Sequence, residues 1–168
     1  EIFLKYFNKH KDWKLIIAPH VIGEDHLKTI LSLIEDKKVI RYTQSTEETV
    51  ADADVLIIDC FGLLSSIYHY GDVAYVGGGF GVGIHNVLEA AVWDMPVLFG
   101  PNNKHFAEAQ GLLRVGGGFE IFDLESFSLL MNQFAEDEEY RNTCGALAGD
   151  YVESLAGATN KVLSNVKL

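Results

Sequence analysis

The chain has 168 residues, of which 48% are hydrophobic and 22% charged, and its formal net charge is −11 at pH 7. This composition is typical of a soluble globular protein and excludes a disordered tail. The acidic balance argues against a broad nucleic-acid-binding surface, which needs a basic face to displace counterions. It is compatible with one small anionic ligand, because backbone N–H groups at a helix start bind phosphate without lysine.

The length predicts a single domain over residues 1–168 with a sizeable core. Cys60 and Cys144 form no CxxC pair, which favours free buried thiols in a reducing compartment. The longest apolar run is far shorter than the ~20 residues that a membrane helix requires, and no signal peptide is recognised. The first residues, EIFLKYFNKH, have the pattern of a helix already under way, so we expect a piece of a longer protein.

Short apolar runs rich in β-branched residues alternate along the chain with segments of helical periodicity. Strands are predicted over residues 13–19, 38–43, 54–60, 72–78, 95–100 and 118–122. Helices are predicted over residues 24–36, 62–70, 85–93, 103–113, 124–134, 137–151 and 155–166.

Several of these strands are nearly continuous apolar runs, which indicates strands covered on both faces. Alternation of such strands with helices predicts an α/β fold: a doubly wound, Rossmann-like parallel sheet flanked by helices. In such sheets ligands bind beyond the carboxyl ends of the strands. The loops that leave the strands are therefore the places to look for function.

The loop after the fourth predicted strand is rich in glycine. Residues 77–83, GGGFGVG, hold five glycines in seven positions, and IHNVLEAAVW then takes helical spacing. Glycines before a helix start allow the backbone to approach a ligand, with unpaired N–H groups suited to a phosphate. No GxGxxG register and no GK[ST] follows, so neither a dinucleotide fingerprint nor a P-loop is indicated.

Glu89 adds a second expectation to this loop. At i+4 from His85 it is expected on the same helix face, one turn inside the helix. A carboxylate there repels phosphate but accepts hydrogen bonds from the vicinal hydroxyls of a ribose. A glycine turn followed by a surface glutamate explains the same pattern, and spacing alone leaves both interpretations open. A second helix start, GPNNKHF over residues 100–106, offers Asn103 or Lys104 to a phosphate or sugar, although capping by Asn explains it as well.

At this point the sequence resembles a known family. The stretch DVAYVGGGFGVGIHNVLEAAVWDMPVLFGPNNKHFAEAQGLL, residues 72–113, is similar to the nucleotide-sugar half of the 3-deoxy-D-manno-octulosonic acid (Kdo) transferases. Upstream, IIDCFGLLSSIYHYGDVA and LIIAPH resemble two further segments of that family. The resemblance covers about residues 12 to 113 and implies the C-terminal, donor-binding half of a two-domain GT-B glycosyltransferase. It also implies that the first strand of that domain is missing here.

The resemblance implies CMP-Kdo as the donor, with no other cofactor and no metal in the donor site. It places Pro19 and His20 at the phosphate or sugar, Phe61 to Leu63 beside the cytidine, and Asn86 to Glu89 at the phosphate and ribose. The expected donor-binding residues are Pro19, His20, Phe61, Gly62, Leu63, Gly78, Gly79, His85, Asn86, Val87, Leu88 and Glu89. No residue here is assigned as catalytic, because the family's general base is a glutamate in the other, N-terminal domain.

Three positions depart from the family pattern. His20 stands where an arginine is common, Ile84 replaces the second glycine of G-G-H-N, and Leu63 replaces a glutamate. These departures affect the expected base and sugar contacts and leave the expected ribose contact unchanged.

The function that the resemblance implies is transfer of Kdo from CMP-Kdo to a lipid A precursor in lipopolysaccharide biosynthesis. The transfer would be inverting and metal-independent, at the cytoplasmic face of a bacterial inner membrane. The isolated chain is expected to be soluble and inactive, with no nucleic-acid partner and membrane contact only through the full-length protein. Two alternatives stay open: a GT-B enzyme with a UDP-sugar donor, such as a UDP-sugar transferase or UDP-N-acetylglucosamine 2-epimerase, and a non-catalytic nucleotide-binding domain.

Overall fold

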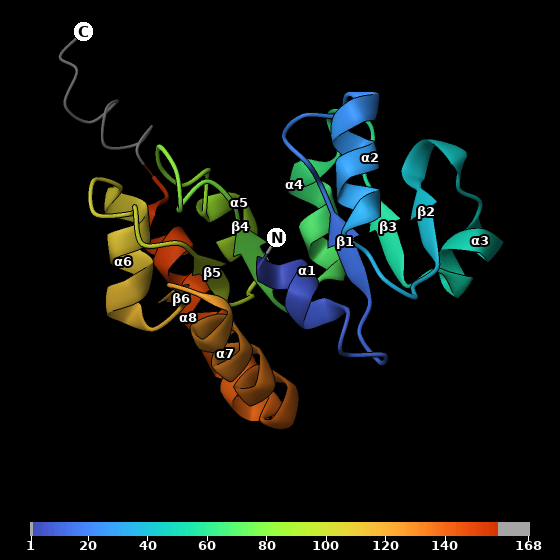
Figure 1. Cartoon of the computed structure of the whole chain (residues 1–168). Coiled ribbons are helices and arrows are strands. Elements are labelled where there is room, and N and C mark those ends of the chain that lie inside the picture. Colours follow the sequence, from blue (N-terminus) through green and yellow to red (C-terminus); the bar gives the residue numbers. More distant parts are fainter. Residues whose placement is uncertain (1, 158–168) are drawn as a thin grey trace, which may run out of the picture. The chain divides into compact units, whose positions relative to one another are not determined.

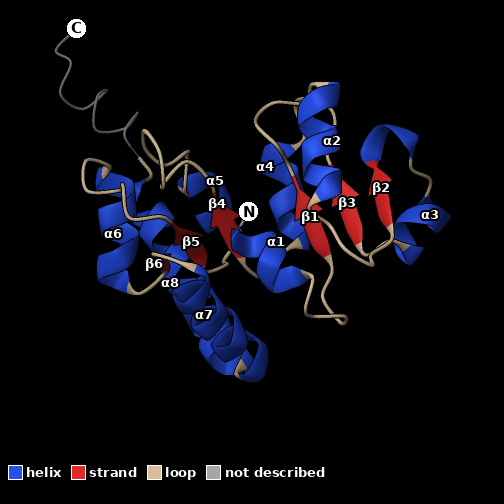
Figure 2. Ribbon diagram, in the orientation of Figure 1, coloured by secondary structure: helices blue, strands red, loops and turns tan. Residues whose placement is uncertain are grey.

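The structure, a computed structural model, describes residues 2–157, in which short strands alternate with helices (Figures 1 and 2). The strands are β1 (Leu15–Ile17), β2 (Val39–Arg41), β3 (Val55–Ile57), β4 (Ala74–Val76), β5 (Val97–Phe99) and β6 (Gly118–Glu120). The helices are α1 (Ile2–Phe7), α2 (Glu24–Ser32), α3 (Glu47–Asp52), α4 (Leu64–Ile67), α5 (Leu88–Ala91), α6 (Ala107–Val115), α7 (Leu124–Glu136) and α8 (Glu138–Leu155). Two 3-10 turns, η1 (Tyr42–Gln44) and η2 (Tyr68–Tyr70), complete the described elements.

The strands form two parallel sheets, one in each of two compact units. Of the described residues, unit 1 comprises 2–69 with Asp123–Leu129, and its sheet has the order β1-β3-β2. Unit 2 comprises Tyr70–Phe122 with residues 130–157, and its sheet has the order β4-β5-β6. Every strand pair is parallel. The predicted class, parallel α/β with flanking helices, is confirmed, whereas the single domain and the missing first strand stay predictions.

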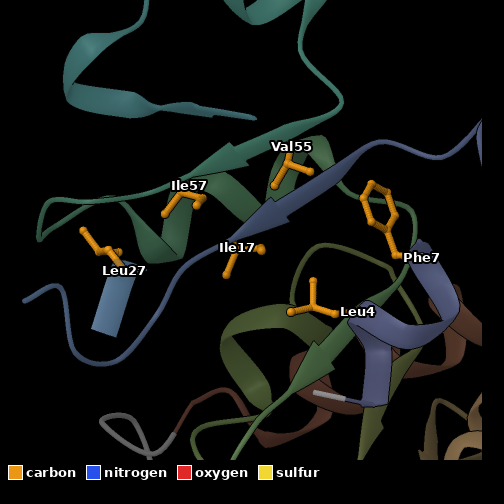
Figure 3. Packing of buried hydrophobic residues seen from close by; sticks show 6 residues of the cluster. All are labelled: Leu4, Phe7, Ile17, Leu27, Val55 and Ile57. Carbon is orange, nitrogen blue, oxygen red and sulfur yellow. The ribbon is translucent and has the colours of Figure 1, made fainter. Parts of the chain in front are cut away.

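The core of unit 1 lies on one face of its sheet. Ile17 is in register with Ile57, and Leu15 with Val55, so these side chains project from the same face. Two helices cover that face: α1 contributes Leu4 and Phe7, and α2 contributes Leu27 (Figure 3). Burial of this apolar cluster fixes the carboxyl end of β1, where the loop with Pro19 begins.

The core of unit 2 is centred on β5. Val97, Leu98 and Phe99 are all fully buried, which shows that both faces of this strand are covered. The flanking strands β4 and β6 are less buried than β5. Helix α6 ends at Gly116, whose φ of 82° provides the left-handed residue that commonly terminates a helix.

All six predicted strands are present, each shorter than predicted. The helices depart from prediction at several places: α3 was not expected, and the helix predicted over residues 85–93 is reduced to α5. The helix predicted over residues 62–70 is divided into α4 and η2. The helix predicted over 155–166 lies almost entirely outside the described residues. No helix of residues 2–157 combines the length and hydropathy of a membrane span.

Candidate functional site

The glycine loop, residues 77–83, leaves β4 at its carboxyl end, as the sequence predicts. It folds back on itself, because Gly81 N–H donates to Gly78 O at 2.9 Å and His85 N–H donates to Gly77 O at 3.1 Å. Gly78 has a φ of 92°, and a Cβ there would meet Gly83 O at 2.3 Å. The tight fold of the loop therefore requires glycine at this position.

The glycine loop packs against the segment of residues 100–106, which we call the clamp segment. A Cβ on Gly79 would lie 2.6 Å from Gly100 N, and a Cβ on Gly83 would lie 2.6 Å from the Phe106 Cζ. These glycines are thus needed for close approach to the protein's own chain. Contact of Gly78 and Gly79 with a donor stays a prediction.

The residues between the glycine loop and α5 are held by Asn86. Its side-chain Oδ1 accepts from Leu88 N–H at 3.0 Å, while its Nδ2 donates to Glu89 Oε1 at 2.9 Å. Asn86 thus accepts a hydrogen bond from the first backbone N–H of α5, as a capping residue does, although it stands two residues before the helix. An incoming anion would find this amide already bonded.

The sequence prediction for Glu89 is wrong in one respect. His85 lies before the helix, so the two residues do not share a helix face, and Glu89 is the second residue of α5 rather than one turn inside. The reason is the bond from His85 N–H to Gly77 O, which keeps this residue in the loop. Glu89 is half-buried, and Asn86 occupies its Oε1, so its Oε2 is the atom available for a ligand hydroxyl.

A surface pocket of about 390 Å³ adjoins this segment. It is lined by residues 84–88 together with Phe106 and Glu108. His85 and Asn86 are exposed, whereas Val87 is 2% exposed and presents almost no surface to a ligand. Phe106 and Glu108 were not predicted as site residues, although the loop after β5 belongs to the ligand edge of the sheet and pointed towards them.

Asn103 was offered by the sequence as a contact to phosphate or sugar, and the structure contradicts this. Its side chain is fully buried, and its Nδ2 donates to Gly100 O at 2.9 Å and to Glu120 Oε1 at 2.6 Å. Its Oδ1 accepts from Gln110 Nε2 at 2.6 Å. These bonds satisfy the carboxamide within the protein, so Asn103 anchors the clamp segment rather than binding a ligand.

The other predicted site residues lie at the carboxyl ends of strands in unit 1. Pro19 and His20 follow β1, with His20 exposed, and residues 61–63 follow β3. Phe61 exposes 79% of its surface, which is unusual for a large apolar side chain and leaves the ring open for stacking. Gly62 has a φ of 89°, which lets the loop turn before α4.

Asp59 organises the ligand edge of unit 1. Its Oδ1 accepts from Thr43 N–H at 2.9 Å and its Oδ2 from the Thr43 hydroxyl at 2.6 Å. Burial acts to raise the pKa of Asp59, but the two bonds from Thr43, a bond from its own backbone N–H and the charge of Arg41 together hold the pKa below its usual value. Nearby, Arg41 donates to both carboxylate oxygens of Glu24, at 2.7 and 3.1 Å, and these bonds lower the pKa of Glu24. Both contacts tie successive strand-end loops together.

Sequence comparison places the chain among glycosyltransferases. It is 32% identical over 127 residues to the 3-deoxy-D-manno-octulosonic acid transferase of Aquifex aeolicus, which covers 72% of this chain and 34% of that protein. It is 31% identical over 139 residues to the enzyme of the same name from Chlamydia muridarum, covering 82% of this chain and 32% of that protein. The chain is homologous to the 3-deoxy-D-manno-octulosonic acid transferases. This confirms the family resemblance, although no family model matches the chain.

A third relative carries two enzymatic activities in its name. A bifunctional glycosyltransferase/methyltransferase of Fusobacterium nucleatum is 30% identical over 148 residues, covering 83% of this chain and 23% of that protein. The chain thus spans between 23% and 34% of the length of these relatives.

Solved structures agree on the fold. The C-terminal CMP-Kdo binding domain of WaaA from Acinetobacter baumannii superposes with a TM-score of 0.75 at 20% identity, covering 90% of this chain and 80% of that one. The C-terminal domain of a group 1 glycosyltransferase, LpcC, from Francisella tularensis gives a TM-score of 0.58 at 15% identity. The predicted fold, the C-terminal half of a GT-B glycosyltransferase, is confirmed.

Proposed function

We propose that this chain binds the nucleotide sugar CMP-Kdo as the donor half of a Kdo transferase. The observation that carries the proposal is the half-buried carboxylate of Glu89, which follows directly on residues 84–88 that line a pocket. Glu89 Oε2 accepts from the ribose hydroxyls, and its bond to Asn86 holds the carboxylate in place. The homology to Kdo transferases supports the choice of donor.

The contacts from unit 1 rest on the resemblance and on exposure. Phe61 offers an uncovered ring to the cytosine face, with Gly62 and Leu63 beside it. Pro19 and His20 are assigned to the phosphate or sugar. Base stacking on an aromatic side chain is worth about 1–3 kcal/mol, so Phe61 supplies affinity more than choice of base. Discrimination between cytosine and uracil falls to the main chain of residues 61–63.

The reaction proposed for the full-length protein is inverting transfer of Kdo to a lipid A precursor, without a metal in the donor site. In it this chain positions the donor and stabilises the departing CMP through polar groups near its phosphate. The attacking hydroxyl is deprotonated by a base outside this chain. The location proposed for that reaction is the cytoplasmic face of a bacterial inner membrane.

Calorimetric titration of this chain with CMP, UMP and UDP tests the donor. We expect CMP to bind more tightly than UMP and UDP. A preference for UDP would favour a UDP-sugar enzyme of the same fold and contradict the proposal. Binding of none of them at millimolar concentration contradicts donor binding by this chain. The test variant is Glu89→Gln, which should weaken binding. Its matched control is Glu136→Gln, which removes an exposed carboxylate of α7 and should leave binding unchanged.

A further inference from the structure

The glycine loop is held by the clamp segment at alternate positions along its length. Gly79 lies against Gly100, where a Cβ on either residue would come within 2.6 Å of the other's backbone. Two residues on, Gly81 O accepts a side-chain bond from Asn102. Two residues further, Gly83 lies against the Phe106 ring. The spacing of these glycines therefore matches a surface of the protein itself.

Asn102 makes the polar part of this contact. Its main-chain N–H donates to Gly79 O at 2.9 Å, and its side-chain Nδ2 donates to Gly81 O at 2.6 Å. One residue thus bonds two carbonyls of the same loop, although its own side chain is exposed. Because Asn102 is exposed, its replacement removes the bond to a loop 21 residues away without removing a buried side chain.

The clamp segment is itself anchored to the sheet. The buried carboxamide of Asn103 bonds Glu120, the last residue of β6, and receives a bond from Gln110 of α6. Asn102 directly precedes the anchored Asn103, so its bonds to the glycine loop restrain that loop relative to the sheet.

Two contacts link the glycine loop to the proposed donor site. Gly77 O accepts from His85 N–H, and Phe106, which meets Gly83, lines the same pocket as His85 and Asn86. We propose that Asn102 is a positioning residue: it fixes the glycine loop so that residues 85–89 are pre-organised for the nucleotide. This inference rests on the proposed function for its ligand, but the restraint on the loop does not.

The test compares Asn102→Ala and Asn102→Asp with the parent chain in CMP titrations and in amide hydrogen exchange of residues 79–83. Loss of one hydrogen bond that pre-organises a site costs about 1 kcal/mol, so we expect the dissociation constant for CMP to rise about fivefold in both variants. Amide exchange in the glycine loop should become faster in both. Aspartate has the size and the turn preference of asparagine but no N–H donor for Gly81 O. A role limited to the shape of the turn would be rescued by Asp, whereas the proposed role is not.

Asn142 of α8 provides matched controls, because it is exposed and its replacement by Ala or Asp makes the same change in size or charge. CMP affinity in Asn102→Asp equal to that of Asn142→Asp would overturn the inference. Glycine-loop exchange that is unchanged in Asn102→Ala would also overturn it. If the parent chain binds no CMP, the proposed function fails, and the exchange measurement alone then decides the restraint.

Discussion

Replacing Gly79 by alanine is the sharpest test of how the glycine loop is packed. A Cβ at this residue would lie 2.6 Å from Gly100 N, 2.7 Å from Gly100 Cα and 2.9 Å from Gly100 C. All three are backbone atoms, which cannot rotate away as a side chain would. Over-packing of this kind costs about 1–3 kcal/mol, and the backbone contact puts Gly79→Ala in the upper half of that range. The expected change is a loss of about 2–3 kcal/mol in the free energy of unfolding.

The matched variant is Gly81→Ala in the same loop. Its Cβ would have Gly78 O at 3.7 Å as its nearest neighbour, an ordinary contact, and its φ is not left-handed. Alanine there reduces the entropy of the unfolded chain and should leave stability unchanged or raise it by about 0.4–1 kcal/mol. Urea unfolding at constant m-value measures both, and the Tm of Gly79→Ala should fall by about 4–12 °C. Equal stability of the two variants would refute the packing of the glycine loop on the clamp segment.

Two further changes test the polar contacts. Asn103→Ala should lower the free energy of unfolding by about 2–3 kcal/mol, since it removes a fully buried carboxamide and leaves its part-buried partners on Gln110 and Glu120 unsatisfied. Urea unfolding with Asn142→Ala as the control measures this loss. A loss below about 0.5 kcal/mol, the size of an ordinary surface change, would contradict the role of this network. Thr43→Val should remove one bond to Asp59 and return its lowered pKa towards 3.8. Folding lowers the pKa of Asp59, so its carboxylate stabilises the folded state fully at pH values above the pKa of the unfolded chain. This contribution is lost as the pH falls through the lowered pKa of the folded state. The stability difference between parent and Thr43→Val should therefore be larger at pH 7 than at pH 3, and a difference independent of pH would contradict the argument.

The order and type of the main elements could be predicted because local pattern determines them. Continuous apolar runs such as VLIID correspond to buried strands, and the parallel pairing follows from their alternation with helices. The short helix α3 was missed because none of its residues is buried, so it has no apolar stripe. Its N-terminal signal was nevertheless present, since Thr46 and Thr49 form a reciprocal capping box.

The glycine loop shows where sequence reasoning stops. A glycine-rich sequence looks the same whether its glycines approach a ligand or another loop of the protein. Only the tertiary contact with residues 100–106 distinguishes the two cases. The length of α5 depended on such a contact as well, because the bond from His85 N–H to Gly77 O delays the helix. Asn103 was misjudged for the same reason: its partners, Gln110 and Glu120, come from elements that spacing does not bring together.

The position of Glu89 was better predicted in chemistry than in geometry. Its carboxylate is accessible near a pocket and is oriented by Asn86, even though it stands at the start of α5. The proposed ligand class, a nucleotide, depends on this contact between Glu89 and the ribose.

A thermodynamic cycle between Glu89 and the ribose tests that contact most directly. CMP and 2′-deoxy-CMP are titrated into the parent chain and into Glu89→Ala, and the four dissociation constants are compared. A hydrogen bond to a charged group is worth about 1.5–3 kcal/mol, so the parent should bind CMP at least about tenfold more tightly than the deoxy nucleotide. In Glu89→Ala the two nucleotides should bind equally. A deoxy penalty of the same size in both proteins would contradict the proposed ribose contact.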